Sequence, residues 1–213
     1  MSPLAHCALT LLLGLLASCE TPHGYRAQGF VGAFDVNRLD VEIEPSLGAT
    51  SQAERSSFPI LGGAWMVPFD ESDSGIEWGL EGGFSWGFKW DSADLAIDGT
   101  ISADNDYTLF DLFGGPYVSV PLGRNLRASL SGGPLVLWSR VELTFDPGGS
   151  EPIDEEGVGY GIYTRAGLDV DLGRGTWAGI GVRFTDSMIV FDDAIEQVDI
   201  GGTQIYLSLT FTY

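Results

Sequence analysis

Several charged residues lie inside otherwise apolar segments, and the chemistry of these side chains needs an explanation. In residues 76–91, which read IEWGLEGGFSWGFKWD, Glu77, Glu81 and Lys89 alternate with a row of aromatic residues. Successive side chains of a strand point to opposite faces, so such a segment would separate its charges from its rings. The charges that this alternation places on the polar faces are Glu77, Glu81, Lys89, Arg127, Arg165, Asp169, Asp171 and Arg183.

Inside an enclosed space, these charges could do one of two things. Opposite charges that are buried together must pair, because an unpaired buried charge is costly, and a paired set would fill the interior as a salt-bridged plug. The same residues could instead line a narrow, ion-selective path. The sequence favours the plug and leaves the path as an alternative.

Catalysis and metal binding have little support in the sequence. Activation of a hydroxyl nucleophile usually needs a histidine that is poised near neutral pH. The only histidines, His6 and His23, and the only cysteines, Cys7 and Cys19, lie at the N-terminus. No acidic segment has the spacing of an EF-hand loop. We therefore predict that the protein is not an enzyme, and that it has no cofactor and no metal site.

The aromatic face of residues 76–91 decides which kind of sheet could carry these charges. A soluble sheet could not leave this row of rings in water, whereas a membrane barrel turns apolar side chains to lipid and polar ones to its lumen. Alternating segments recur along the chain. The candidate strands are Gly29–Glu42, Phe58–Phe69, Ile76–Asp91, Tyr107–Pro121, Leu126–Leu143, Tyr160–Leu172, Thr176–Phe191 and Thr203–Tyr213. The sequence thus predicts an all-β fold, an eight-stranded antiparallel up-and-down transmembrane β-barrel.

The connections between these segments alternate between short and long. The short ones are Asp70–Gly75, Leu122–Asn125 and Gly173–Gly175. The long ones cover roughly Ile43–Ser57, Ser92–Asp106, Thr144–Gly159 and Asp192–Gly202. Tight periplasmic turns and longer extracellular loops are typical of outer-membrane barrels. Eight strands would place both termini on the periplasmic side and the long loops outside the cell.

Two residues of the segment Thr176–Phe191 break its alternation. Asp186 falls in the apolar row, and we expect it to mark a bulge or the extracellular end of the strand. Trp177 falls on the polar face, and the sequence offers no reason for a ring there.

The N-terminus has the features of an export signal. Ala8–Ala17 is apolar but too short to span a bilayer as a helix, and it fits a secretory signal peptide. Residues 16–19 (LASC) resemble a bacterial lipobox, which implies acylation of Cys19; ordinary signal-peptidase cleavage nearby is the alternative. Residues 1–6 carry no Lys or Arg, which is atypical of a signal peptide. The predicted division is a signal peptide at 1–19, a polar tether at 20–28 and the barrel at 29–213.

Two further patterns fit a barrel in a membrane. Leu209, Phe211 and the final Tyr213 share one face, which resembles the C-terminal assembly signal of bacterial outer-membrane proteins and implies the outer-membrane assembly machinery as a partner. Aromatic residues near strand ends would form an interfacial girdle. Its predicted members are Trp78, Trp90, Tyr107, Trp138, Tyr160 and Tyr213.

The overall charge limits the partners. A net charge of −20, with 10 Lys and Arg against 30 Asp and Glu, argues against nucleic acid as a ligand. The strands, the turn pattern and the C-terminus together resemble the small OmpA/OmpX-type barrels of bacterial outer membranes. This resemblance implies outer-membrane lipid as the surroundings and a non-enzymatic structural or surface-interaction role, with the surface partner unknown.

Two alternatives to that role remain open. The first is a narrow channel for small solutes. The second is a lipid-anchored soluble barrel of lipocalin type, in which the apolar face would point inward to hold an apolar ligand.

Overall fold

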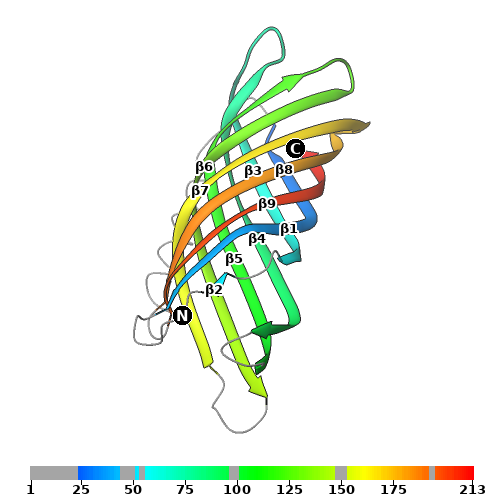
Figure 1. Cartoon of the computed structure of the whole chain (residues 1–213). Coiled ribbons are helices and arrows are strands. Elements are labelled where there is room, and N and C mark those ends of the chain that lie inside the picture. The colour runs from blue at the N-terminus through cyan, green and yellow to red at the C-terminus, as the bar shows by residue number, and fades with distance from the viewer. Residues whose placement is uncertain (1–23, 44–50, 53–55, 96–100, 147–152, 192–194) are drawn as a thin grey trace.

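The computed structural model describes residues 24–43, 51–52, 56–95, 101–146, 153–191 and 195–213. Eight long strands and one two-residue strand make up this part of the chain (Figure 1). They are β1 (Arg26–Ile43), β2 (Ser51–Gln52), β3 (Ser56–Glu71), β4 (Glu77–Leu95), β5 (Ile101–Pro121), β6 (Leu126–Asp146), β7 (Ile153–Gly173), β8 (Thr176–Phe191) and β9 (Ile195–Thr212). Within these ranges, no helix is long and apolar enough to cross a membrane.

The long strands form a closed antiparallel ring. Each of them pairs with the next along the chain, and β1 pairs with β9 from Arg26–Thr212 to Ile43–Ile195. The short strand β2 adds only the pairs Asp40–Gln52 and Val41–Ser51 to the edge of β1. The predicted fold class, an eight-stranded antiparallel up-and-down barrel, is confirmed.

The strands extend further than the sequence indicated, mainly at the end away from the short turns. The β4–β5 ladder continues to the pair Leu95–Ile101, and the β6–β7 ladder continues to Leu143–Ile153. Figure 1 shows these hairpins projecting beyond the other strands. The predicted loops at 92–106 and 144–159 were therefore too long. These stretches lack a clear apolar face, so alternation could not mark them as strands.

The start of the barrel also differs from the prediction. Strand β1 begins at Arg26 rather than Gly29, so Arg26 and Gln28 belong to the barrel and not to the polar tether. Both side chains have polar partners in the lumen, Glu77 for Arg26 and Thr210 for Gln28. A rule that begins strands at their first apolar residues could not include them.

The predicted short turns are confirmed, and those after β3 and β7 have a simple backbone cause. Gly75 has a φ of 76° and donates a 2.8 Å hydrogen bond to the Ser72 carbonyl. The β7–β8 turn consists of Arg174 and Gly175, with φ values of 58° and 75°. Positive φ at both central residues suits the primed turns that match the twist of a two-residue hairpin. Because these turns share one end of the barrel, we call it the turn end and the opposite one the loop end.

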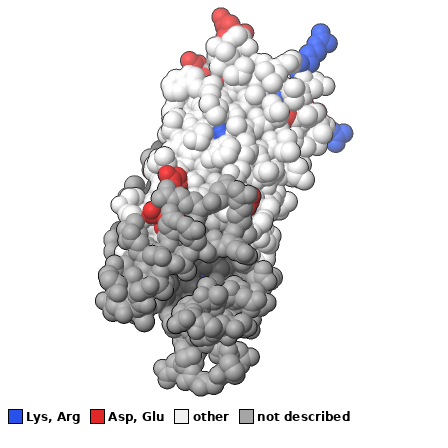
Figure 2. Space-filling view, viewed as in Figure 1, with Lys and Arg blue, Asp and Glu red and all other residues white. Residues whose placement is uncertain are grey.

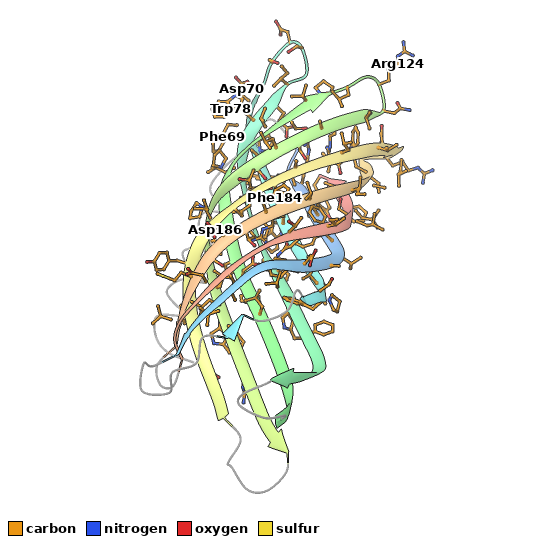
Figure 3. All side chains as sticks on the ribbon, viewed as in Figure 1. Phe69, Asp70, Trp78, Arg124, Phe184 and Asp186 are labelled. Carbon is orange, nitrogen blue, oxygen red and sulfur yellow. The ribbon has the colours of Figure 1, made fainter. Side chains whose placement is uncertain are left out.

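The apolar faces point outward. On β4, Trp78, Leu80 and Trp86 are 45–51% exposed, whereas Glu77 and Glu81 are buried in the lumen. The lipocalin alternative, in which the apolar rows point inward, is therefore wrong for this strand. Asp186 lies on the outer face and pairs in continuous register with Ile162 and Gly201, so the expected bulge is absent (Figure 3).

Candidate functional site

The lumen is filled by side chains, and the cluster nearest the turn end contains two ion pairs. Arg26 Nη2 lies 2.5 Å from Glu77 Oε2, and the Tyr117 hydroxyl donates to Glu77 Oε1 at 2.5 Å. Arg127 Nε donates to Asp169 Oδ2 at 3.0 Å. We call these residues, with Trp177, the turn-end cluster.

Trp177 belongs to this cluster because its ring lies under a guanidinium group. Arg127 Cζ is 4.3 Å from the centroid of the indole ring. A cation over the face of a tryptophan is attracted by the ring quadrupole, and this attraction grows when both partners leave water. This contact explains the inward position of Trp177, for which alternation offered no reason.

A second cluster forms around Glu81 and Arg165 in the middle of the barrel. Glu81 accepts hydrogen bonds from Ser131 Oγ at 2.5 Å, Tyr163 Oη at 2.9 Å and Arg165 Nη1 at 3.2 Å. Arg165 Nε donates to Tyr206 Oη at 2.5 Å. A further hydrogen bond joins Arg165 Nη2 to Gln28 Oε1. We call this set the Arg165 cluster.

A third cluster surrounds Arg183, which is 1% exposed. Its two terminal nitrogens bind both oxygens of Asp111, at 2.8 and 3.2 Å, and Ser85 Oγ donates to Asp111 Oδ2 at 2.5 Å. The guanidinium carbon lies 4.3 Å from the ring centroid of Phe113. A bidentate arginine–carboxylate pair is a strong, geometrically specific contact. We call this set the Arg183 cluster.

Arg165 and Arg183 stand directly opposite each other across the β7–β8 ladder. Like charges at directly opposed positions destabilise a sheet. Here each arginine turns to a different carboxylate from across the lumen, Glu81 on β4 for the first and Asp111 on β5 for the second. The two clusters therefore depend on one another, because either carboxylate also relieves the repulsion between the two cations.

Toward the loop end, the lumen becomes apolar. Phe34 and Phe58 meet edge to face with ring centroids 5.1 Å apart. Further buried side chains complete this apolar cluster, namely Val36, Ile60, Leu109, Leu137, Ile189, Val198 and Ile200. The interior is thus a polar network at the turn end and a hydrophobic core at the loop end, whereas the sequence indicated a salt-bridged plug alone.

The outer face changes polarity at the same level. The first exposed charges beyond the apolar rows are Asp35 on β1, Arg140 on β6, Glu156 on β7 and Asp186 on β8. Asp70 and Arg124 are exposed at the turn end. Between these borders lies an uncharged belt, which Figure 2 shows as a white zone on the viewed face. Inside this belt the outward side chains are uncharged, and at its loop-end border exposed charges appear while apolar side chains such as Phe34 and Ile189 are buried in the lumen.

The predicted site residues take several positions. Glu77, Glu81, Arg127, Arg165, Asp169 and Arg183 lie buried in the clusters described above. Asp171 instead sits at the β7–β8 turn, where it accepts a 2.7 Å hydrogen bond from the Gly173 N–H. The Lys89 side chain lies outside the described residues, as does Cys19.

Several members of the clusters were not predicted. Asp111 shares a face of β5 with the apolar Leu109 and Phe113, so alternation along that strand did not single it out as an inward charge. Arg26 lay before the predicted first strand. Tyr117, Tyr163 and Tyr206 are buried rings whose hydroxyl groups serve the charged clusters. An inward Tyr in a polar row is the signal that could have found them.

The predicted aromatic girdle lies partly within the described residues. Trp78, Tyr160 and Tyr213 are 51%, 64% and 79% exposed on the outer surface, and Trp138 is half-buried. Figure 3 labels Trp78 near the turn end, where it packs edge to face on Phe69. The side chains of Trp90 and Tyr107 lie outside the described residues. The predicted C-terminal signal residues Leu209 and Phe211 are 49% and 43% exposed.

The described residues offer little for other chemistry. No group of three or more His, Cys, Asp or Glu side chains among them could hold a metal ion. Three buried polar atoms have no hydrogen-bond partner in this part of the chain, namely Arg127 Nη1, Arg183 Nε and Ser139 Oγ. Two of them lie on the arginines that anchor the polar network, so the network has spare donors in its interior.

Solved structures share this fold. The outer membrane protein OprG from Pseudomonas aeruginosa superposes with a TM-score of 0.55 at 13% identity, over 90% of this chain and 96% of that one. The outer membrane protease OmpT from Escherichia coli gives a TM-score of 0.52 at 9% identity, over 91% and 98%. No family model and no curated sequence matches. At these identities the likeness concerns the fold alone.

Proposed function

We propose that the chain is a bacterial outer-membrane barrel that crosses the membrane with its uncharged belt and has a non-enzymatic, structural or surface-interaction role. The uncharged outer belt, which has exposed charges at both of its borders, carries this proposal. Apolar outward side chains suit lipid, and the exposed charges at the borders suit water. OprG and OmpT, which share the fold, are named as outer-membrane proteins.

The proposed orientation places the turn end in the periplasm and the loop end outside the cell. Short turns at one end and long hairpins at the other support this assignment. A cysteine at the exposed turn position Ser74 gives a direct test. We expect Ser74→Cys to resist a membrane-impermeant maleimide in intact cells and to react after outer-membrane permeabilisation, with the chain that keeps Ser74 as the control for labelling of Cys7 and Cys19. Labelling in intact cells would contradict the orientation.

Acylation of Cys19 and recognition by the assembly machinery are separate parts of the proposal. Palmitate labelling of the whole chain should disappear in Cys19→Ser, and labelling that persists would contradict the lipid anchor.

Removal of the terminal Tyr213 should slow insertion in cells but leave detergent refolding unchanged. Equal losses in both would indicate a folding defect instead of a lost signal.

A closed lumen is the functional feature that the side-chain packing supports best. Each of the four arginines in the clusters has a carboxylate within 3.2 Å, and the apolar cluster covers the network at the loop end. Planar-bilayer recording of the mature, refolded chain is the test, with heat-modifiable gel mobility as the check on folding. We expect an inserted but electrically silent protein.

A narrow conduit is the second candidate, because the polar clusters form a continuous series and leave the donors Arg127 Nη1 and Arg183 Nε without partners. Discrete, reproducible openings would replace the closed barrel by this conduit.

Enzyme function is not part of the proposal. OmpT is a protease with the same fold, so the fold does not decide this point. The clusters lack histidine and cysteine, which leaves no usual general base or thiol nucleophile in them.

A further inference from the structure

Two arginines are exposed on neighbouring turns at the turn end. Arg124 lies in the β5–β6 turn, and Arg174 lies in the β7–β8 turn. A 2.9 Å hydrogen bond from the Asp171 N–H to the Asn125 carbonyl joins these two turns. Figure 2 shows exposed cations projecting from one side of the turn end and acidic side chains on another, and Figure 3 labels Arg124. We call Arg124 and Arg174 the turn-end arginines.

The turn-end arginines are not engaged inside the protein. Each of the four arginines in the lumen clusters binds a carboxylate, whereas Arg124 and Arg174 have no ion pair within the described residues. Asp171 lies close to Arg174 in the sequence, but it accepts its hydrogen bond from the Gly173 N–H. In a chain with a net charge of −20, two free guanidinium groups on adjacent turns form a local positive surface.

The backbone at Arg174 is strained, and this is a second, independent sign that the side chain is used. Its φ of 58° lies in the left-handed region, where a long side chain is uncommon. Every other described residue with a positive φ is a glycine. Asn, Asp or Gly would form the first position of a two-residue hairpin turn with less strain. Strained residues persist at ligand-binding sites, so the arginine side chain, and not the turn, is what this position requires.

Exposed leucines place both arginines at the border of the uncharged belt. Leu122 and Leu126 flank Arg124 and are 54% and 37% exposed. Leu172, two residues before Arg174, is 61% exposed. In a barrel that crosses a membrane with this belt, these leucines lie at the edge of the hydrocarbon, and the turns beyond them reach the lipid headgroups. The planar donors of a guanidinium suit a phosphate group at that level.

We propose that Arg124 and Arg174 together bind the phosphate of an anionic glycerophospholipid in the leaflet at the turn end. This inference rests on the membrane-spanning role proposed above and goes beyond it, because it predicts a preference for one class of headgroup at one place on the barrel. The ammonium group of a zwitterionic lipid repels a guanidinium, whereas an anionic lipid has no such group. The proposed orientation makes this leaflet the periplasmic one.

The test measures which lipid stays bound to the barrel. Each full chain is inserted into vesicles that contain equal amounts of phosphatidylethanolamine and phosphatidylglycerol, extracted in mild detergent and weighed by native mass spectrometry. Arg124→Gln and Arg174→Asn each remove one positive charge, and a double variant removes both. Ser74→Asp is the matched control, because it makes the same change in net charge on the exposed β3–β4 turn at the same end.

We expect the wild type and Ser74→Asp to retain phosphatidylglycerol in excess over phosphatidylethanolamine. Arg124→Gln and Arg174→Asn should each lower this excess about 5-fold, the scale of one basic residue at an anionic membrane surface, and the double variant should lower it further. Because Asn tolerates the positive φ of the turn better than Arg, Arg174→Asn should lose the preference without losing stability. A contact that merely held the turn together would lose both.

An excess that persists in the double variant, or an equal fall in Ser74→Asp, would overturn the inference. Binding of the inserted chain to isolated peptidoglycan that depends on both arginines, with no excess of phosphatidylglycerol, would assign the turn-end arginines to the cell wall instead. A chain that fails to insert into vesicles overturns the proposed function, whereas one that inserts and shows no excess overturns this inference alone.

Discussion

The pair formed by Asp111 and Arg183 offers the sharpest test of how the lumen is held together. Asp111→Ala leaves the guanidinium of Arg183 buried without its carboxylate, and Arg165 faces it across the β7–β8 ladder. Breaking a buried ion pair by removing one partner costs about 3–5 kcal/mol. We take about 4 kcal/mol as the expected loss, which lowers the folding equilibrium constant roughly 1000-fold.

The double variant Asp111→Leu/Arg183→Met separates pairing from packing. Apolar replacements of similar volume remove the charge and its desolvation together, so such changes are often neutral or stabilising. Here Ser85 loses its acceptor, so we expect a small loss that stays well below that of Asp111→Ala. Guanidinium unfolding of the refolded barrel in lipid vesicles, followed by tryptophan fluorescence, measures all variants.

Asp186→Ala is the matched control, because Asp186 is an exposed aspartate on the outer face. Surface changes of this kind usually stay within about 0.5 kcal/mol. An Asp111→Ala variant as stable as this control would refute the reasoning, since the buried pair would then contribute nothing. The loss of the double variant could also equal the sum of the losses of Asp111→Leu alone and Arg183→Met alone. That result would refute the reasoning too, because the two residues would not be coupled.

Three further substitutions test individual contacts by the same unfolding measurement. Trp177→Ala should lower the free energy of unfolding by about 1–2 kcal/mol, because the stacking on Arg127 is lost. An unchanged unfolding midpoint would mean that this contact does not stabilise the barrel. Gly181→Ala should lower the free energy of unfolding by more than about 1 kcal/mol, because a Cβ at this position would overlap the Tyr206 ring and overpack the lumen. Wild-type stability of this variant would mean that the ring shifts freely. Arg174→Asn should raise the free energy of unfolding by up to about 1 kcal/mol, since Asn tolerates the positive φ of the turn better than Arg. A lower free energy of unfolding would mean that the Arg174 side chain itself stabilises the barrel.

The sequence predicted those parts of the fold that depend on local pattern. Alternation along β4 assigned Glu77 and Trp78 to opposite faces, and the short Gly173–Gly175 connection marked a tight hairpin. The prediction of a closed ring rested on the count of eight alternating segments. These features need only the period of a strand and the chemistry of a turn.

The pairing inside the lumen could not be predicted in this way. Alternation placed Arg183 inward, but its partner Asp111 lies on β5, which is not a neighbour of β8. Only the tilt and stagger of the closed barrel bring these two side chains together. The same holds for Arg165 and Glu81. A lone inward Trp177 could be explained only once Arg127 was known to lie over it.

The apolar cluster was missed for a different reason, and this reason bears on how the barrel works. Alternation was interpreted with one rule for the whole strand, apolar outward and polar inward. On β1 the inward row is polar at Gln28 but apolar at Phe30 and Phe34, which are buried in the lumen, and Asp35 is exposed on the outer face. The strand keeps its period while its inward side chains change from polar to apolar. The loop end therefore has an apolar core of its own, and that core covers the polar network on that side of the lumen.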